Sequence, residues 1–576
     1  MASSYSKQKV NKNYSQFFDD DDDVDRYSSD GSDLSLPGDV GNLTDSSDEH
    51  SDSDNESGED QTDSDGSDSS DVSAAGDARP RDQDWTEDLD GLGLHPDFAY
   101  PHGPTVVNID YLPIDYFHLL FNEEFYDRIM DQTNLYARQN PRRNEHWEPL
   151  TDVREVKAYL AIQLYMGIVK LNCTTDYWSS DPLLNQPFVS NLIVKNRFKE
   201  LNKNFHVADN TLNPPKGRPG HDPLGRVRPI LDMISLSFPG NFNPRQNMCI
   251  DEGMIKFKGR CPFLQYLPAK PTKWGIKAWA VCDSHSLYML NFNIYTGKFN
   301  DLGNGDRPLG DRVVLGLMGP YLDKHHVVYF DNYFSSLPLF ETLFQRDTYA
   351  CGTVRSNRKG WPAYFKQKKC VKKPGDTLVR RKNSVQAIAW YDRKKVLVAS
   401  TAHDSSTVEK TRRARPGTEP LTYPRPTAIA QYSLNYFGVD KHDQLRQYYS
   451  CASRAHKYWK YIFWFVVDCC AVNAWILYKM MPLGPRRKPL SHKAFMLSII
   501  RALAGDFVGR KRIGRPLKRP SGHSLTRIAT KRGCRDCVQC KKDGMKTKSN
   551  HAIQSRLECL ACTYALCKAC FTKLHP

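Results

Sequence analysis

The chain has 576 residues, 40% of them hydrophobic and 25% charged, which is enough for two or more domains and a sizeable core. Sixteen cysteines in so long a chain, seven of them after residue 533, exclude a small disulfide scaffold, and the polar, acidic start predicts no secretory signal peptide. Positions 1–90 hold 27 acidic and 6 basic residues, whereas the other positions hold 74 basic and 39 acidic residues. The net charge of +14 therefore combines an acidic N-terminal region with a strongly basic body. Such a body indicates a protein that binds a polyanion, most often nucleic acid.

The first 93 residues form an acidic region that we predict to be disordered. Runs such as FDDDDDVD contain too few apolar groups to offset the entropy lost on ordering. Their many Ser-Asp sites favour acid-directed phosphorylation, which would add negative charge. Two interpretations stay open, a solubilising tail and an autoinhibitory mimic of DNA.

Residues 94–247 have a mainly helical pattern. Apolar residues recur at helical spacing in 111–139 and in 152–171, and acidic residues lie near the start of each segment. We therefore expect a helical region here.

The pattern changes to strands over residues 248–357. Segments 248–259, 279–297 and 325–334 are rich in β-branched and aromatic residues, and the segment 308–322 between the last two reads as a helix. Strands that alternate with a helix predict an α/β core.

Residues 358–426 predict a separate small β insertion. Residues 385–401 form a plausible hairpin around Asp392-Arg393-Lys394, and 411–427 is a proline-rich return segment.

The stretch from Tyr458 to Met480 is the one segment long enough to suggest a membrane helix. However, Asp468 and Asn473 lie inside it and basic residues crowd the surrounding chain. Because a charge inside a bilayer is costly, we predict a buried core helix and no membrane span.

Three aspartates lie where an apolar run ends or a predicted helix begins. Asp251 follows a short apolar run, Asp331 ends a buried-type strand, and Asp440 leads into a helix on which Asp443 shares its face. Converging carboxylates repel one another, and the usual reason to gather them is a pair of divalent cations that handle phosphoryl oxygens. Taken singly, an aspartate in such a position is more often a helix cap or a surface residue than a metal ligand. The spacing of the three aspartates along the chain does not change that expectation.

The sequence motifs around these aspartates favour the metal-binding interpretation. The segments YWSSDPLL, NRFKELNKNFH, IDEGMIKFKGR, FDNYFSS, CGTVRSNRKG and GVDKHDQ, followed by a cysteine-rich end, occur in this order between about Tyr111 and Pro576. In this series the chain resembles the piggyBac family of DNA transposases.

The resemblance implies an α/β fold with an RNase H-like catalytic core that is split by a β-rich insertion, flanked by a helical dimerisation and DNA-binding domain and closed by a zinc-binding cross-brace finger. The expected parts are a disordered acidic region (1–93), the helical domain (94–247 and 450–508), the catalytic domain (248–357 and 427–449), the insertion (358–426), a basic linker (509–530) and the cysteine-rich domain (531–576).

The same resemblance implies a cut-and-paste transposase with an Asp-Asp-Asp site. Asp251, Asp331 and Asp440 would hold two Mg²⁺ ions, which Mn²⁺ can replace, and Asp443 would be an accessory catalytic acid. The expected partners are double-stranded DNA, as transposon terminal repeats and a TTAA target, and a second copy of the chain in a homodimer or higher assembly, in the nucleus. The alternative is a domesticated DNA-binding or chromatin protein without transposition activity.

The end of the chain predicts a zinc domain. Eight nitrogen or sulfur ligands, the number that two tetrahedral Zn²⁺ ions need, are present. They are Cys534, Cys537, Cys540, Cys559, Cys562, Cys567, Cys570 and His575. So short a segment with few large apolar residues needs metal to fold. His551 is a spare ligand, the division between the two ions stays open, and Cys540 and Cys567 stand where relatives can have histidine.

Basic residues predict DNA contacts in two places. The segment 509–520 contains a Gly514-Arg515-Pro516 core like a minor-groove AT-hook, and it is also typical of a nuclear localisation signal. Its basic residues are Arg510, Lys511, Arg512, Arg515, Lys518 and Arg519. Arg355 and Arg358 would be solvated loop charges on their own, and the resemblance implies that they engage target DNA near the active site.

Overall fold

The structure, a computed structural model, describes residues 84–93, 95–108, 110–268, 270, 272–297, 307–367, 369–412, 419–452, 455, 457–481, 488–509, 525–529, 533–559 and 562–574. The acidic stretch before residue 84, the basic segment 510–524 and His575 lie outside these ranges. Within them the chain is a mixed α/β fold, as the sequence predicts. It is built around one large sheet, which also includes strands of the β insertion that the sequence predicts to be separate.

Nine of the described strands form this central sheet. Their order is β4-β5-β3-β7-β8-β11-β10-β9, and β6 also pairs with β5. The strands are β3 (Asn247–Lys256), β4 (Leu264–Tyr266), β5 (Trp274–Asp283), β6 (Met289–Ile294), β7 (Val327–Phe330), β8 (Tyr349–Thr353), β9 (Thr377–Lys382), β10 (Val385–Tyr391) and β11 (Lys395–Ser400).

Strand β3 lies at the centre of the sheet, antiparallel to β5 and parallel to β7. The parallel register places Ile250 beside Phe330, and β7 continues in parallel with β8. Parallel neighbours need crossover connections, which α7 (Leu309–Met318) supplies before β7 and α8 (Leu337–Gln345) supplies after it. The residues that follow Ile250 and Phe330 therefore lie side by side on neighbouring strands.

The predicted hairpin at Asp392 is present, because β10 and β11 are antiparallel with Tyr391 opposite Lys395. Strand β11 also pairs with β8, so β9, β10 and β11 continue the central sheet. The proline-rich return segment contributes β13 (Leu421–Pro426), which pairs with β12 (Thr407–Arg412) in a separate two-stranded sheet.

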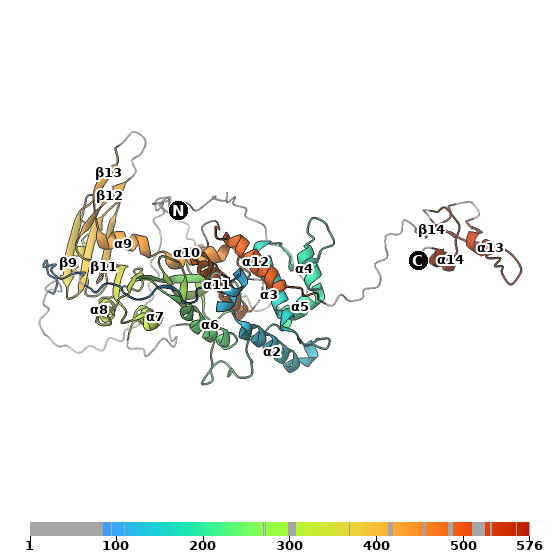
Figure 1. Cartoon of the computed structure of the whole chain (residues 1–576), viewed down its shortest axis with the longest axis horizontal. Helices are drawn as coiled ribbons and strands as arrows, with labels where there is room; N and C mark the ends of the chain where they lie inside the picture. The colour runs from blue at the N-terminus through green and yellow to red at the C-terminus, as the bar shows by residue number, and fades with distance from the viewer. Residues whose placement is uncertain are drawn as a thin grey trace, which may run out of the picture. The chain divides into compact units, whose positions relative to one another are not determined.

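Helices before and after the central sheet pack against each other. They are α1 (Pro113–Leu120), α2 (Glu123–Gln139), α3 (Val153–Ile168), α4 (Pro187–Leu192), α5 (Lys195–Asn204), α6 (Arg228–Gly240), α9 (Thr427–Asn435), α10 (Gly438–Tyr448), α11 (Tyr458–Met480) and α12 (His492–Ala504), with short 3₁₀ turns at Pro141–Arg143, Thr174–Trp178, Gly319–Tyr321 and Ala363–Lys366. Helix α12 packs on α3 and α11 packs on α1, so both predicted helical segments share one helical layer (Figure 1). The two-residue strands β1 (Gly103–Pro104) and β2 (Phe242–Asn243) pair beside it.

Helix α11 is apolar on all sides and is buried, as predicted. It is the one described helix that is long and apolar enough to cross a bilayer, and 83% of its most apolar window lies inside the fold. The carboxylate and the amide inside it have partners: Asp468 accepts hydrogen bonds from Ser450 Oγ (2.6 Å) and Cys451 N (2.9 Å), and Asn473 pairs with both main-chain groups of Met289. Satisfied polar groups of this kind are what a core helix requires.

Residues 84–93 differ from the prediction that the acidic region is disordered up to residue 93. Trp85 is buried, lies edge-on to Trp361 at 6.0 Å and donates a hydrogen bond to the Gly360 carbonyl (3.0 Å). Thr86 forms a β-bridge with Arg381. The physical reason is that Trp85 and Leu92 give this end of the acidic region apolar surface to bury.

The described part of the cysteine-rich end contains two short strand pairs and two short helices. They are β14 (Leu525–Arg527) with β17 (Leu557–Cys559), β15 (Arg535–Asp536) with β16 (Gln554–Ser555), α13 (Val538–Lys542) and α14 (Lys568–Leu574). Their buried cluster consists mainly of thiols, together with Leu566. Such a core is too small to fold through apolar burial alone.

Candidate active site

Two of the predicted aspartates lie at matched positions of neighbouring parallel strands. Asp251 is on β3, and Asp331 follows the last residue of β7. Because Ile250 is paired with Phe330, the residues one step further along the two strands are neighbours. This register follows from two buried apolar runs that each end in an acid.

The turn after Asp331 is fixed by its own sequence. The Asp331 carboxylate accepts a hydrogen bond from Tyr333 N (2.9 Å), and Ser335 Oγ donates to the Asp331 carbonyl (3.1 Å). Ser336 caps α8, since its Oγ accepts a hydrogen bond from Leu339 N (3.2 Å). The FDNYFSS segment therefore ends a strand, holds a carboxylate at that end and starts a helix.

Helix α10 brings Asp440 close to Asp251. Its first residue is Gly438, where an added Cβ would lie 2.5 Å from Cys249 Sγ on β3, so only glycine allows so close an approach. Two residues later, Asp440 is half-exposed on the first turn of the helix.

Lys270 joins Asp440 to Asp251. Its ammonium nitrogen lies 3.5 Å from Asp251 Oδ2 and 3.5 Å from Asp440 Oδ1, and it donates a hydrogen bond to the Glu252 carbonyl (3.2 Å). A single cation thus lies between two of the predicted metal ligands. Burial lowers the pKa of Lys270, but the neighbouring carboxylates outweigh this effect and raise the pKa.

Asp251 and Asp331 are held in an environment that disfavours their charged form. Burial, followed by the negative charges of Asp440 and Glu252, raises the pKa of Asp251 to about 7 against the opposing effect of Lys270. Burial and then the charge of Glu252 also raise the pKa of Asp331, although the hydrogen bond from Tyr333 N opposes them. Clustered, desolvated carboxylates with raised pKa values are typical of a functional site.

Three residues of this site were missed in the sequence. Glu252 adds a negative charge beside Asp251 and Asp331, and its carboxylate pairs with Lys277 at 3.3 Å. Lys277 also lies over the Tyr333 ring at 4.6 Å. The adjacency of Glu252 to Asp251 was a usable signal, whereas Lys270 lies in a basic segment that resembles a solvated loop and Lys277 is a single lysine within the apolar strand β5.

Asp443 makes different contacts from Asp440. Arg446 Nε donates a hydrogen bond to Asp443 Oδ1 (2.9 Å), and Gln447 Nε2 donates to Oδ2 (2.7 Å). The buried Arg446 also donates to the Met254 carbonyl on β3 (3.4 Å) and lies 3.9 Å from Asp468 on α11. These contacts tie α10 to β3 and α11, and the accessory catalytic role of Asp443 stays a prediction.

Arg355 and Arg358 both hold the loop after Asp331. Arg355 Nε donates to Asn332 Oδ1 (2.9 Å), while Arg358 Nη2 donates to the carbonyls of Asn332 (2.6 Å) and Tyr333 (2.7 Å). Arg355 is exposed and Arg358 is half-buried. Both predicted DNA contacts therefore lie beside the carboxylates, and the six predicted contacts at 510–519 lie outside the described residues.

Four of the predicted zinc ligands form a compact cluster. The sulfurs of Cys537, Cys540, Cys567 and Cys570 all lie within 4.8 Å of one another, the one such group of possible metal ligands among the described residues. Cys540 Sγ is 3.4 Å from Cys570 Sγ and 3.8 Å from Cys567 Sγ. Four thiolates at tetrahedral positions 2.3 Å from a zinc ion lie about 3.8 Å apart, so the cluster fits this ion.

The thiols of the cluster act on one another: burial and the neighbouring thiols raise the pKa values of Cys540 and Cys570, whereas the pKa of Cys537 is lowered. Burial raises the pKa of Cys537, but hydrogen bonds from the main-chain N–H groups of Cys540 and Cys567 outweigh it and lower the pKa to about 7. Of the remaining predicted ligands, Cys559 and Cys562 are neighbours, Cys534 Sγ donates to Gln554 Oε1 (3.3 Å), and His575 lies outside the described residues.

Comparison with known proteins places these features in one class. A family model described as "Transposase IS4" matches residues 112–475, which include the three aspartates of the site. The human PiggyBac transposable element-derived protein 2 is 23% identical over 441 residues, which cover 74% of this chain and 72% of that protein. The human PiggyBac transposable element-derived protein 5 is 23% identical over 409 residues, which cover 68% of this chain and 75% of that protein.

A solved structure has the same fold. The piggyBac transposase in a cryo-EM synaptic complex with hairpin DNA aligns with a TM-score of 0.63 at 24% identity, over 82% of this chain and 100% of that one. Fold and family match thus define the class, which is that of the transposases. The chain belongs to the piggyBac-type transposase family.

Proposed function

We propose that the chain cleaves and joins DNA strands as a cut-and-paste transposase, through Asp251, Asp331 and Asp440. The observation that carries this proposal is the shared Lys270 ammonium at 3.5 Å from Asp251 and Asp440, with Asp331 at the matched position of the next strand. Acids with raised pKa values at the end of a central sheet are an arrangement suited to binding cations.

We also infer that the catalytic core is RNase H-like. Strands β3, β5 and β6 form an antiparallel meander, and β7 and β8 continue the sheet in parallel on the other side of β3. Strand β3 carries Asp251, and Asp331 follows the last residue of its parallel neighbour β7.

The site suits a hard divalent cation, because its donors are carboxylate oxygens and a positive charge already lies between two of them. Asp251, Asp331 and Asp440 would hold two Mg²⁺ or Mn²⁺ ions. When bound, such ions lower the pKa of a water molecule and stabilise negative charge on phosphate oxygens. The protein holds Asp331 through its loop, on which Arg355 and Arg358 converge, and desolvates Asp251 between β3 and α10.

The substrate in this proposal is double-stranded DNA, both as transposon ends and as a TTAA target. The basic body and Arg355 beside the carboxylates support it, and so does the fold of a transposase solved with hairpin DNA. We extend the proposal to a homodimer or higher assembly that works in the nucleus.

We propose that the cysteine-rich end binds two structural Zn²⁺ ions. The four clustered sulfurs support one site, and the neighbouring Cys559 and Cys562 support half of a second. His575 and either Cys534 or His551 are the candidates to complete that second site.

The test of the catalytic assignment is excision of a donor DNA in cells, with the inverted repeats that flank the coding region as ends. Asp331→Asn should abolish excision, whereas Asp232→Asn, an exposed acid on α6, should leave it unchanged. Excision by Asp331→Asn at the level of the unmodified chain would refute the assignment.

The second candidate function is a domesticated DNA-binding protein that has lost transposition. The names of the human relatives, which call them derived from transposable elements, favour this candidate. Intact DNA binding together with no excision by the unmodified chain, from any matching flanking repeats, would decide for it.

A further inference from the structure

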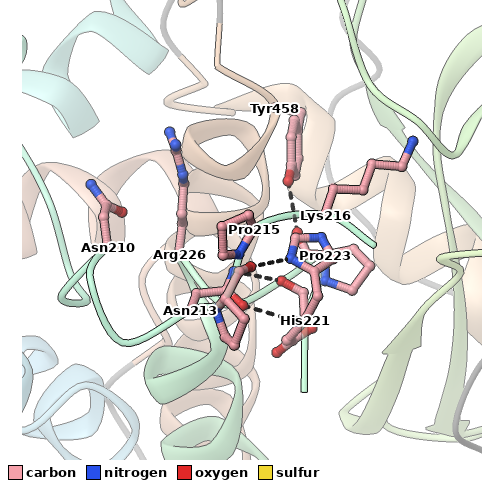
Figure 2. Close-up of a pocket in the computed structure, with 10 residues that line it drawn as sticks. Asn210, Asn213, Pro215, Lys216, His221, Pro223, Arg226 and Tyr458 are labelled. Atoms are coloured by element: carbon pink, nitrogen blue, oxygen red, sulfur yellow. Dashed lines mark hydrogen bonds between the residues drawn. The ribbon is translucent and has the colours of Figure 1, made fainter. Parts of the chain in front are cut away.

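Two loops of the structure are held in different ways. The loop 210–226 borders the pocket in Figure 2 and is held by its own polar groups, since Asn213 and Asp222 exchange hydrogen bonds of 2.8 and 3.0 Å. The loop 354–362, which we call the arginine loop, instead receives a hydrogen bond from Trp85, a residue 275 positions away in the sequence. Closing so long a stretch of chain costs entropy, which the contacts of Trp85 must offset.

Trp85 belongs to residues 84–93, the docked segment, which contacts the outer edge of the central sheet. Strand β9 is the last strand in the sheet order, so the side of β9 that faces away from β10 is a sheet edge. Thr86 and Arg381 fill part of this edge by exchanging main-chain hydrogen bonds of 2.8 and 2.9 Å. Addition of an extended segment to a sheet edge is a common mode of peptide recognition.

The side chains of β9 match the acids of the docked segment in charge. Glu87 pairs with Arg380 at 2.5 Å, and Asp84 pairs with Lys382 at 3.0 Å. Ion pairs with an exposed partner contribute little to stability, but complementary charges fix the register in which two surfaces meet. The edge of β9 therefore suits an acidic peptide.

Trp85 is the apolar anchor of the docked segment. Its buried ring lies edge-on to Trp361 at 6.0 Å, and its indole N–H donates to the Gly360 carbonyl (3.0 Å). Trp361 is also buried, and its main-chain N–H donates to the Arg358 carbonyl (3.2 Å). Burial of a large aromatic side chain supplies most of the free energy of such a contact.

The docked segment is fixed at its other end as well. Leu92 is buried there, and Gly93 has a φ of +71°. A Cβ added at Gly93 would lie 2.4 Å from Asp404 N, so only glycine allows the two main chains to approach so closely. The segment is thus held from Trp85 to Gly93.

The arginine loop connects the docked segment to the carboxylates. It consists of turns and bends, so its position depends on side-chain contacts. Arg358 Nη2 donates to the carbonyl of Asn332 (2.6 Å), the residue directly after Asp331. A series of direct contacts therefore runs from Trp85 through Trp361 and Arg358 to the turn that holds Asp331.

We propose that the docked segment is an intramolecular peptide ligand of the sheet edge and that Trp85 is a positioning residue of the candidate active site, which acts by holding the arginine loop. The site takes an extended acidic peptide with one tryptophan, and the chain supplies this peptide itself. The proposal rests on the proposed function only in its last step, in which the arginine loop serves the carboxylates.

The first test is binding of a fluorescent peptide with the sequence of residues 84–93 to the full-length Trp85→Ala chain, measured by anisotropy. The peptide should bind with a Kd below about 1 mM, because a short tether gives the chain's own segment an effective concentration on that order. Binding to the unmodified chain should be at least about tenfold weaker, since its own segment occupies the site. A peptide that carries Trp85→Ala should not bind.

The second test is hydrogen–deuterium exchange of the arginine loop in the full chain. In Trp85→Ala its main-chain amides should exchange at least about tenfold faster, because a segment that loses buried contacts opens more often. An excess of the peptide should restore slow exchange. The control is Tyr100→Ala, which removes a ring that lies beside His325 instead of the loop and should leave the exchange unchanged.

Excision of donor DNA tests the positioning role. Trp85→Ala should lower excision by about tenfold or more, because small displacements at an active site are costly, and Trp85→Phe should recover most of it. Equal peptide affinity in Trp85→Ala and the unmodified chain, exchange that rises along the whole chain, or full excision by Trp85→Ala would overturn the proposal. The binding and exchange measurements need no catalysis, so they test the docked segment even if an unmodified chain without excision refutes the proposed function.

Discussion

At the scale of single residues, Lys270 supplies positive charge where the proposed metal ligands meet. Its ammonium lies 3.5 Å from both Asp251 and Asp440, so a divalent cation in the same place must displace it. At such a short distance, the Coulomb repulsion between the Lys270 ammonium and a bound divalent cation amounts to several kcal/mol at an effective dielectric constant of about 20.

We therefore expect Lys270→Gln to bind Mn²⁺ more tightly than the unmodified chain, by at least about threefold, because like-charge repulsion over such a distance is lost. Calorimetric titration with Mn²⁺ checks this. Lys273→Gln, an exposed lysine of the same connection, is the matched control. Equal affinities in all three proteins would show that Lys270 does not occupy the cation site.

The raised pKa of Asp251 predicts a pH dependence of stability. Its folded-state pKa of about 7 exceeds the ordinary value of 3.8, so between these pH values the folded state binds more protons than the unfolded state. The contribution of this residue to the free energy of unfolding should thus decrease as the pH rises from about 4 to 7. Urea denaturation without divalent ions, at several pH values, should show a weaker decrease for Asp251→Asn, and parallel curves would contradict the assignment.

At the scale of elements, the position of α10 depends on the buried Arg446. This side chain binds Asp443 on its own helix, the Met254 carbonyl on β3 and Asp468 on α11, and its guanidinium lies over the Phe465 ring at 4.9 Å. Asp440 lies at the start of the same helix, so this contact network positions a proposed metal ligand from a distance.

Arg446→Met should destabilise the chain by about 3–5 kcal/mol, because it leaves the buried Asp468 and the half-buried Asp443 without their cation. Adding Asp443→Asn to this variant should restore part of the lost stability, since the negative charge of Asp443 is then removed. Urea denaturation of the single and double variants measures both effects. A double variant less stable than Arg446→Met would contradict the proposed charge balance.

Local patterns predicted many elements but not how they pair. The alternation of apolar runs predicted β3, α7, β7 and the hairpin at Asp392, and the apolar segment after Lys457 predicted the buried α11. The pairing of β11 with β8 was not predictable, because it joins residues far apart in the sequence and depends on which sheet edge is free.

The residues of the candidate site, like the elements, could be predicted only in part. Asp251 follows an apolar run within β3, Asp331 follows the last residue of β7, and Asp440 lies on the first turn of α10, and each of these positions leaves a trace in the local pattern. Lys270 has no such trace, since its role depends entirely on which acids the fold brings within 3.5 Å. The resemblance to a family identified the three aspartates as a set. Neither the local pattern nor the resemblance indicated that Arg446 holds the helix that carries Asp440.

At the scale of the whole molecule, we expect the cysteine-rich end to be a metal-dependent unit. Cys537→Ser should lower the zinc content of the purified chain by one ion, because the thiolate it removes belongs to the four-sulfur cluster. Elemental analysis of the protein measures this, with Cys173→Ser as control for a cysteine outside the cluster. Unchanged zinc content would show that the cluster binds no zinc.

The account of the whole chain rests on a divalent cation held by carboxylates from β3, β7 and α10. Mn²⁺ titration of the full chain against Asp251→Asn/Asp331→Asn tests it most directly, with Asp232→Asn as control. We predict saturable binding that Mg²⁺ competes for in the unmodified chain and in Asp232→Asn, and a loss of affinity of about 100-fold or more in the double variant, in line with the removal of two oxygen ligands. Equal Mn²⁺ affinity in all three proteins would contradict the account.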